Sequence, residues 1–184
     1  MIYIITGIAK SGKTLISQEM KHRFNLSVFS TDYIMMMLHY SDESPDLDIN
    51  ASDSTVARKI EPYVYGLIKA MVHQREDVVI EGVHFTPEFS ERLLREFHVN
   101  LRIVYLGYKD MSVEEKVKEL KSHRKRMNNP WIFNHKGQKI EEIVAYMIKE
   151  SDRLFNECFE HNLLYFEVED INQQKDEIID LVMN

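Results

Sequence analysis

Gly7-Ile8-Ala9-Lys10-Ser11-Gly12-Lys13-Thr14 fits the pattern G-x-x-x-x-G-K-[ST], in which a glycine-rich loop wraps around a polyphosphate. Residues 1–6 before it form an apolar, β-branched run of strand length. Residues 15–24 after it carry apolar side chains at helical spacing. Because the pattern requires a strand before the loop and a helix after it, this context favours a phosphate-binding loop.

The residue types in this loop match the chemistry of phosphate binding. Glycines let the backbone curl so that amide N–H groups point inward, and the following helix adds its positive dipole end. Lys13 is expected to reach the β- and γ-phosphates, and the Thr14 hydroxyl is expected to bind Mg²⁺. A glycine-rich turn that precedes Lys-Thr by chance would occur in about one chain of this length in a hundred. The residues expected to bind the nucleotide are Gly7, Lys10, Ser11, Gly12, Lys13 and Thr14.

The composition is that of an ordinary globular chain, with 44% hydrophobic and 29% charged residues, and we expect residues 1–184 to form one domain. The formal net charge of −7 argues against non-specific binding to nucleic acid, which favours a basic surface. No apolar run approaches the ~18 residues that span a bilayer, and the first strand leads directly into the loop as a core strand rather than a signal peptide. Cys158 is the single cysteine, so no internal disulfide can form. We therefore expect a cytoplasmic protein, monomeric or homodimeric, that contacts neither nucleic acid nor membrane.

Apolar runs of strand length alternate with amphipathic helical stretches along the whole chain. Strands are expected at residues 1–6, 28–30, 78–82, 100–107 and 163–168. Helices are expected at residues 15–24, 33–38, 55–74, 87–97, from 112 onward, 140–161 and 175–182, with a kink or a break at Pro62. This alternation predicts an α/β fold, a three-layer α/β/α sandwich in which helices cover a five-stranded parallel sheet.

Asp32 follows the short strand at residues 28–30. In an open α/β sheet the carboxyl ends of the strands face the ligand crevice, so an aspartate there can accept the proton of an attacking hydroxyl. Asp32 is also a good N-cap for the helix at residues 33–38, which is the structural alternative. The phosphate-binding loop beside it favours the catalytic interpretation. The acidic residues 41–54 either shape an acceptor site or form a solvated surface loop.

Val78-Val79-Ile80-Glu81-Gly82 has the pattern of a buried parallel strand closed by an acid. Glu81 is expected to orient Mg²⁺ or to touch the acceptor, and Gly82 allows the acceptor to approach the backbone closely. His84 stands at the same edge, where it touches the acceptor or the phosphate, or has a structural role. Arg58, in the first turns of the long helix, holds an anionic acceptor or lies on the solvated helix face.

A basic cluster follows the fourth predicted strand in a chain that is acidic overall. Its members are Lys118, Lys121, His123, Arg124, Lys125 and Arg126. A solvated helix face is the plain interpretation, but a lid that closes over a triphosphate needs arginines to neutralise charge on the transferred group. We expect Arg124 and Arg126 to have this role, with one or both pointing inward, in a lid over about residues 110–138.

With these motifs, the chain resembles over its whole length the small phosphate-loop kinases of the nucleoside- and nucleotide-kinase type. The resemblance rests on residues 7–14, Asp32, the pair Glu81-Gly82 and the basic segment 121–126. It implies a P-loop NTPase kinase fold with the strand order 2-3-1-4-5 and a helical lid after strand 4.

Within that group, Ser30-Thr31-Asp32 and Ile80-Glu81-Gly82-Val83-His84 are most similar to 2-phosphoglycerate kinases. The Glu-Gly pair is also similar to uridine kinases and phosphoribulokinases. An aspartate at the end of strand 2 is also found in shikimate-type and toxin-type small-molecule kinases. These acceptors all offer a hydroxyl group, for which a base is useful.

Nucleoside monophosphate kinases phosphorylate a phosphate, which is already ionised and needs no base. Asp32 therefore favours an ATP-dependent kinase that transfers the γ-phosphoryl group to a hydroxyl of a small molecule, which is 2-phosphoglycerate-like, a sugar or a nucleoside. A nucleoside monophosphate kinase and an ATP-binding protein without transferase activity are the alternatives. A GTPase is disfavoured, because Asn134-His135-Lys136-Gly137 lacks the aspartate of the guanine-specifying motif and follows no predicted strand.

Overall fold

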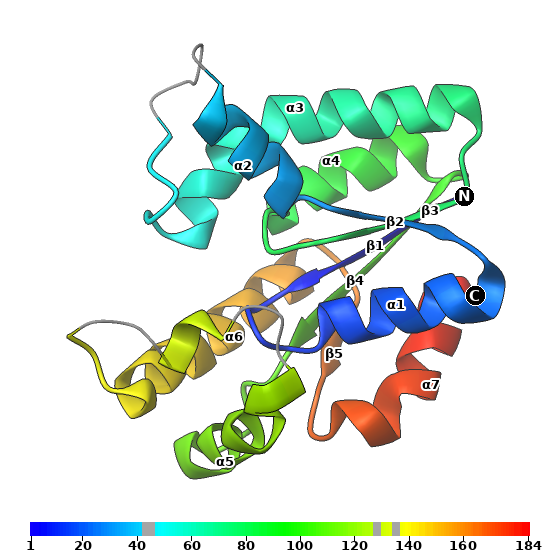
Figure 1. Ribbon diagram of the computed structural model, residues 1–184. Helices are drawn as coiled ribbons and strands as arrows, with labels where there is room; N and C mark the ends of the chain where they lie inside the picture. Colours follow the sequence, from blue (N-terminus) through cyan, green and yellow to red (C-terminus); the bar gives the residue numbers. More distant parts are fainter. Residues whose placement is uncertain (42–46, 127–129, 134–136) are drawn as a thin grey trace.

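The computed structural model describes residues 1–41, 47–126, 130–133 and 137–184 (Figure 1). Its strands are β1 (Ile2–Gly7), β2 (Ser27–Ser30), β3 (Val78–Glu81), β4 (Leu101–Gly107) and β5 (Tyr165–Glu167). The α-helices of this part of the chain are α1 (Lys13–Phe24), α2 (Asp32–Tyr40), α3 (Asp53–Gln74), α4 (Pro87–Phe97), α5 (Val113–His123), α6 (Ile140–Glu160) and α7 (Ile171–Met183). Two short 3₁₀-helices, η1 (Arg124–Arg126) and η2 (Trp131–Phe133), follow α5.

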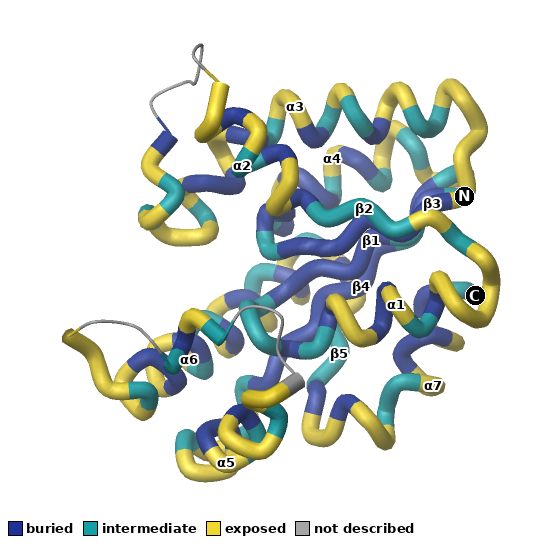
Figure 2. The backbone as a smooth tube through the Cα atoms, viewed as in Figure 1, coloured by how far each residue is buried: buried dark blue, intermediate teal, exposed yellow. Residues whose placement is uncertain are grey.

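One parallel sheet runs through the middle of the molecule in the strand order β2-β3-β1-β4-β5. β1 pairs with β3 on one side and with β4 on the other, so that Ile4 lies opposite both Ile80 and Ile103. Helices α3 and α4 cover one face, and α1 and α7 cover the other (Figure 1). Strands covered on both faces need apolar side chains in both directions, and Figure 2 shows β1, β3 and β4 as the buried layer. The predicted three-layer fold and its strand order are confirmed.

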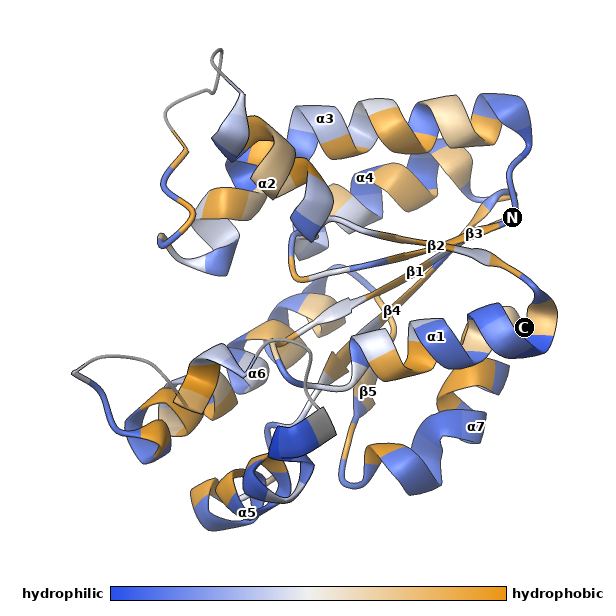
Figure 3. Cartoon of the chain, in the orientation of Figure 1, coloured by the Kyte–Doolittle hydropathy of each residue, from blue (hydrophilic) through white to orange (hydrophobic). Residues whose placement is uncertain are grey.

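An apolar core on each face holds the layers together. The larger core packs β1 and β4 against α3, α4 and the end of α6, and Ile4, Ile60 and Leu93 are fully buried in it. The other core packs Ile16 of α1 and Ile178 of α7 against the opposite face. Figure 3 shows apolar stripes on the helices that pack here, beside hydrophilic outer sides. Each fully buried aliphatic side chain contributes about 1.5–3 kcal/mol, so these cores fix the positions of the strand ends. Within the described residues, no helix combines the length and the apolar character that crossing a membrane requires.

The strand order reverses at β1, because β2 and β3 are added on one side of β1, and β4 and β5 on the other. Connections that leave a parallel sheet in opposite directions open a crevice at the carboxyl ends of the strands. The segments that meet there are the loop after Gly7, the start of α2 after Ser30, and the loop after Glu81. The sequence predicts the phosphate-binding residues, Asp32, and the group Glu81, Gly82 and His84 in these three segments.

Side-chain caps explain two of the helix starts that lie earlier than the sequence predicts. α3 begins at Asp53, two residues earlier than predicted, because the Ser52 hydroxyl accepts a hydrogen bond of 3.3 Å from the Thr55 N–H. α7 begins at Ile171, four residues earlier than predicted, because the Asp170 carboxylate accepts from the N–H groups two and three residues further on. Both caps lie in stretches that composition assigns to loops.

Two further features of the helices differ from what the sequence suggests. Thr31, not Asp32, is the N-cap of α2, so Asp32 is the first residue of the helix and its carboxylate is not used as a cap. α3 also runs without a break through Pro62. Pro62 lies on the exposed side of the helix, so the carbonyl that loses its helical partner is on the solvent side and the helix continues.

The loop after β3 comes so close to the start of α2 that only glycine fits at position 82. Gly82 has a φ of +154°, and a Cβ atom there would overlap the Thr31 hydroxyl. The Thr31 N–H donates to the Glu81 carbonyl at 2.9 Å, which draws the two segments together. On the side of Gly82 where a Cβ atom would stand, the space is therefore filled by Thr31. The contact expected between Gly82 and the acceptor stays a prediction.

Gly82→Ala is expected to lower the free energy of unfolding by about 2–3 kcal/mol, because the new Cβ must displace Thr31. Urea denaturation measures the change. Gly66→Ala in α3 is the matched control, since nothing lies within 4 Å of a Cβ added there. That substitution should raise the free energy of unfolding by about 0.5–1 kcal/mol, because glycine disfavours a helix interior. A Gly82→Ala protein as stable as the wild type would contradict this account of the close approach.

Candidate active site

The glycine-rich loop is fixed at its start by β4. Gly7 ends β1 with a φ of +118°, and a Cβ atom there would overlap the Leu106 carbonyl oxygen. The Ile8 N–H donates to the same carbonyl at 3.0 Å. The loop ends at Lys13, where α1 begins, so the positive end of the α1 dipole lies at the end of the loop. The loop therefore has the form of an anion-binding cradle between β1 and α1.

Lys13 is a buried cation inside this loop. Lys13 is 6% exposed, and its Nζ donates to the carbonyl of Ile8 at 2.6 Å and to that of Gly7 at 3.2 Å. Burial lowers the pKa of Lys13 to about 8, although the nearby carboxylates, Glu81 first among them, act in the opposite direction. A phosphate in the loop would favour the charged form of this lysine. The role expected for Lys13 stays a prediction, and the geometry is compatible with it.

Thr14 and Glu81 form the oxygen pair that a magnesium ion would use. Thr14 Oγ1 donates to Glu81 Oε2 at 3.2 Å, because pairing of β1 with β3 places Glu81 opposite Ile5. A hydroxyl and a carboxylate are hard oxygen ligands that suit Mg²⁺. In the part of the chain that the structure describes, no group of three His, Cys, Asp or Glu side chains could hold a metal. The pair therefore fits a Mg²⁺ that takes its remaining ligands from phosphate oxygens and water.

A cavity of about 570 Å³ opens on this loop, and we call it the loop cavity. Its walls come from the loop and α1, the start of α2, the end of β3 and the loop after it, α5, η2, and the start of α7. Lys10, Asp32, Glu81 and Trp131 are among its lining residues. Lys10 Nζ also lies 5.5 Å from the ring centroid of Trp131. The cavity therefore presents both cations and carboxylates next to the predicted phosphate site.

Asp32 stands at the rim of the loop cavity, with its side chain 65% exposed. His84 lies behind it and is 2% exposed. The Nδ1 atom of His84 is 2.8 Å from Thr31 Oγ1 and 3.8 Å from Asp32 Oδ1. Burial first, and then the positive charge of Lys13, lower the pKa of His84 to about 4, so the imidazole is neutral at pH 7. The structure thus places His84 behind Asp32 instead of at the edge of the crevice, where the sequence analysis expected it.

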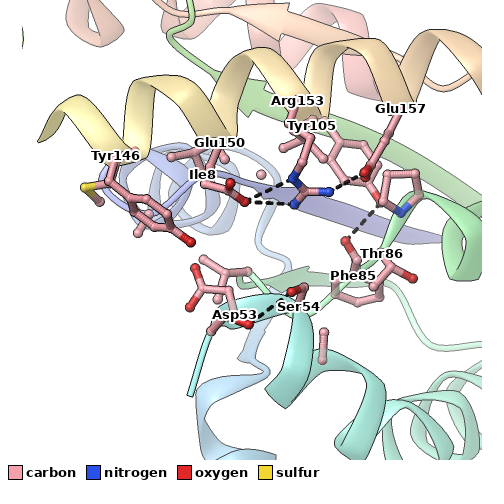
Figure 4. Close-up of a pocket in the computed structure, with 18 of the residues that line it drawn as sticks. Ile8, Asp53, Ser54, Phe85, Thr86, Tyr105, Tyr146, Glu150, Arg153 and Glu157 are labelled. Carbon is pink, nitrogen blue, oxygen red and sulfur yellow. Dashed lines mark hydrogen bonds and ion pairs between the residues drawn. The ribbon is translucent and has the colours of Figure 1, made fainter. Parts of the chain in front are cut away.

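A second cavity, of about 680 Å³, lies between the start of α3, the loop after β3, and α6 (Figure 4), and we call it the helix cavity. Arg58 lines it, as do residues 50–54 from the acidic loop. Ala9, Val83 and Trp131 line both cavities, so the two cavities share a wall. A ligand on the phosphate-binding loop and a ligand in the helix cavity would therefore approach each other there.

Several α6 residues of the helix cavity belong to no motif in the sequence. Tyr146, Glu150 and Arg153 extend from α6 into it (Figure 4). Arg153 forms ion pairs with Glu150, at 3.0 Å, and with Glu157. Their spacing of three and four residues on one helix face is visible in the sequence, but a polar stripe of this kind usually faces water. Only the fold shows that it faces a cavity.

Asp53 comes to the same cavity from the start of α3 (Figure 4). The pKa of its carboxyl is raised, mainly because it is removed from water. Lys13 acts against this shift, and the carboxylates of Asp32 and Glu150 add to it. Charges from both cavities therefore act on Asp53 across the shared wall.

The basic cluster lies in α5 and η1, next to the loop cavity, and His123 lines that cavity. The Arg124 guanidinium stacks over the ring of Phe133, 4.8 Å from its centroid. Arg126 is the last residue of η1, and its side chain lies outside the described part of the chain. The inward orientation expected for these arginines stays a prediction.

His84 should make the stability of the protein depend on pH. Its folded pKa of about 4 is below the ordinary 6.5, so between these values the unfolded chain binds a proton that the folded protein does not bind. The free energy of unfolding should therefore fall as the pH drops from 6.5 to 4, by up to about 3 kcal/mol from this residue. Urea denaturation at pH 7 and pH 4.5 should show a smaller loss for His84→Gln, whose amide can still bond to Thr31. Equal losses in the two proteins would contradict the burial argument.

Comparison with known proteins relates this chain to others by its fold. No protein-family model matches the sequence, and no curated protein matches it. The structure is similar to that of shikimate kinase from Acinetobacter baumannii in complex with shikimate, with a TM-score of 0.59, 14% identity, and coverage of 99% of this chain and 92% of that chain. It is similar to a sugar kinase from a Janibacter species, with a TM-score of 0.54, 13% identity, and coverage of 99% and 91%. It is also similar to a gluconokinase from Sinorhizobium meliloti, with a TM-score of 0.51, 15% identity, and coverage of 97% and 86%. The chain therefore has the P-loop kinase fold of these proteins.

Proposed function

We propose that this protein is an ATP-dependent kinase that transfers the γ-phosphoryl group to a hydroxyl group of a small-molecule acceptor. The observation that carries the proposal is the wall shared by the two cavities, because phosphoryl transfer needs a donor site and an acceptor site in contact. The phosphate-binding loop and Asp32 line the loop cavity, and Arg58 and Arg153 line the helix cavity. The similar structures support the proposal, since they are described as kinases of shikimate, a sugar and gluconate, which all carry hydroxyl groups.

In this proposal, the phosphates of Mg·ATP bind to residues 7–14. Lys13 binds the β- and γ-phosphates, and Thr14 and Glu81 hold Mg²⁺ directly or through water. Asp32 accepts the proton of the acceptor hydroxyl while the hydroxyl oxygen bonds to the γ-phosphorus. The bond between the γ-phosphorus and the β,γ-bridging oxygen breaks, and ADP is released.

His84 has an orienting role in this scheme. It is neutral at pH 7 because burial lowers its pKa to about 4, so it does not compete with Asp32 for the proton. Its Nδ1 atom contacts the Thr31 hydroxyl and lies 3.8 Å from the Asp32 carboxylate. A fixed imidazole behind Asp32 limits the positions that the carboxylate can adopt.

The acceptor is proposed to bind in the helix cavity, where the lining offers two kinds of contact. The guanidinium groups of Arg58 and Arg153 suit a carboxylate or phosphate, as in a 2-phosphoglycerate-like acceptor. The carboxylates of Asp53 and Glu150 suit the hydroxyl groups of a sugar or nucleoside.

We also propose that residues 1–184 act as one kinase domain with a lid over about residues 110–138. Closure of this lid would bring Arg124 or Arg126 to the transferred phosphoryl group and would exclude water from the loop cavity. The position of α5 and η1 beside the loop cavity supports this part of the proposal.

The test of the function is ADP release by the wild-type protein with Mg·ATP and a panel of 2-phosphoglycerate, shikimate, sugars, nucleosides and nucleoside monophosphates. Stimulation by a hydroxyl compound supports the proposal. Stimulation by nucleoside monophosphates alone identifies a nucleoside monophosphate kinase instead. Binding of ATP without stimulation by any compound indicates an ATP-binding protein that is not a transferase.

Asp32→Asn is expected to lower kcat by about 10²–10⁴, because the acceptor hydroxyl loses its base. The Kd for Mg·ATP, measured by isothermal titration calorimetry, should stay within about twofold of the wild type, since Asp32 does not bind the nucleotide in this proposal. Asp110→Asn is the matched control, because it neutralises an exposed aspartate that pairs with Lys109. Full turnover by Asp32→Asn would rule out the base assignment.

Glu81→Gln and Thr14→Val should each raise the Mg²⁺ concentration needed for half-maximal activity by about tenfold, because each removes one oxygen ligand or its orienting partner. Steady-state rates at fixed ATP and increasing Mg²⁺ measure this. Glu76→Gln, at an exposed position just before β3, is the control and should keep the wild-type Mg²⁺ dependence. An unchanged Mg²⁺ dependence in both site variants would argue against this metal site.

A further inference from the structure

Two buried side chains from a distant part of the sequence hold the outward carbonyls of the phosphate-binding loop. Tyr108, just after β4, is fully buried, and its hydroxyl donates to the Ala9 carbonyl at 2.8 Å. Lys116 of α5 is 1% exposed, and its Nζ donates to the Lys10 carbonyl at 3.0 Å. The two acceptors are consecutive carbonyls of the loop, so one stretch of loop backbone is held from outside at two adjacent peptide groups.

The two donors form one unit. Lys116 Nζ lies 4.0 Å from the centroid of the Tyr108 ring, within the range of a cation–π contact. The backbone of Tyr108 is itself fixed, because its N–H donates to Ser151 Oγ of α6 at 2.8 Å. The pairing of Gly7 with Leu106 brings the end of β4 beside the loop. This pairing therefore places Tyr108 and the start of α5 on the outer side of the loop.

Packing alone does not explain a lysine at position 116. Burial of an ammonium group is costly, and an apolar side chain of similar size would avoid that cost. Burial lowers the pKa of Lys116, and the carboxylate of Glu119, 2.6 Å away, acts against the shift. What a lysine supplies here, and an apolar side chain would not, is the hydrogen bond to the loop together with the ion pair to Glu119.

The direction in which these carbonyls point decides which groups face a ligand. A trans peptide is planar, so the C=O of one residue and the N–H of the next residue point in opposite directions. When the carbonyls of Ala9 and Lys10 are held outward, the N–H groups of Lys10 and Ser11 turn inward. The Ser11 N–H indeed points across the loop to the Ile8 carbonyl, at 3.3 Å. Inward N–H groups are what a loop of this kind offers to phosphate oxygens.

Lys116 also connects the loop to the wall of the loop cavity. Glu119, its ion-pair partner, lines that cavity, and the second oxygen of its carboxylate is 3.9 Å from Nδ1 of His123. His123 is the last residue of α5 and precedes η1. The contacts thus run from the loop backbone through Lys116 and Glu119 to the end of α5.

We propose that Tyr108 and Lys116 are positioning residues that set the peptide orientation of the phosphate-binding loop, and that Glu119 links this orientation to the end of α5. The proposal rests on the proposed function in one respect, since it takes a polyphosphate as the ligand of the loop. Neither residue touches that ligand, and both act through the loop backbone.

Lys116→Met and Tyr108→Phe test the proposal, because each removes a donor and keeps most of the side-chain volume. Each is expected to weaken Mg·ATP binding about tenfold in isothermal titration calorimetry and to raise the KM for ATP without changing the KM for the acceptor. The double variant should weaken binding by less than the product of the single effects, because both donors act on one stretch of backbone.

Two substitutions outside this unit serve as matched controls. Lys109→Met removes an ammonium group that pairs with Asp110. Tyr65→Phe removes a hydroxyl of α3 that donates to Glu96 Oε1 of α4 at 2.9 Å. Among the described residues, neither group bonds to the loop or to Tyr108, Lys116 and Ser151, so both variants should bind Mg·ATP like the wild type.

The thermal midpoint of each variant separates a positioning role from a structural one. A lower midpoint with unchanged ATP affinity in both variants would overturn the proposal. If Lys116→Met does not fold, the ATP affinity of Tyr108→Phe tests the proposal, because this variant keeps the buried ring. A wild-type protein that binds no Mg·ATP would overturn the proposed function and this inference with it. A wild-type protein that binds ATP but phosphorylates no acceptor would overturn the proposed kinase activity. The positioning role would stand in that case if the two variants bind ATP more weakly than the wild type.

Glu119→Gln tests the link to α5, because it removes the charge that pairs with Lys116. It is expected to weaken Mg·ATP binding in the wild-type background and to have no further effect in the Lys116→Met background. An equal effect in both backgrounds would show that Glu119 acts on the nucleotide independently of Lys116 and would overturn the link.

Discussion

The position of β1 between two parallel neighbours is the constraint on which the rest of the structure depends. β3 and β4 occupy both edges of β1, so the chain after Gly7 has to leave the sheet between them. The same pairings place Glu81 opposite Ile5 and Leu106 opposite Gly7. A carboxylate therefore reaches Thr14 from one side, and the end of β4 supports the loop from the other. The loop owes its shape to the sheet as much as to its glycines.

The layers of the fold could be predicted because burial on both faces leaves a direct trace in the sequence. A strand such as Val78-Val79-Ile80 has no polar face, so it must lie inside a covered parallel sheet. The strand order followed from the resemblance to phosphate-loop kinases and is the observed one. Helix starts were harder to predict, because Ser52 and Asp170 become caps only when a particular N–H group meets the side chain. The sequence predicts a kink or a break at Pro62, and α3 has no break there because the proline lies on the solvent side of its helix.

Parts of the candidate site could be predicted where chain position alone places a residue at the end of a strand. Glu81 is of this kind, Thr14 could be predicted from the glycine-rich loop motif, and the structure brings the two together. Contacts between distant segments left no trace of this kind. His84 is buried next to Thr31, which is distant in the sequence. Lys116 is buried because the end of β4, which pairs with β1, places α5 beside the loop. Such residues look like ordinary polar positions until the fold shows what lies next to them.

The low pKa of Lys13 has a consequence for any anion that enters the loop. A free ammonium group with a pKa of about 8 has lost part of its charge in mildly alkaline solution. A phosphate beside it favours the charged form, so binding above this pH takes up a proton from solution. The proton then acts as a second ligand of the loop, and the apparent affinity for the anion falls as the pH rises past 8. Below that pH Lys13 is already charged, so its titration adds no further pH dependence to anion binding.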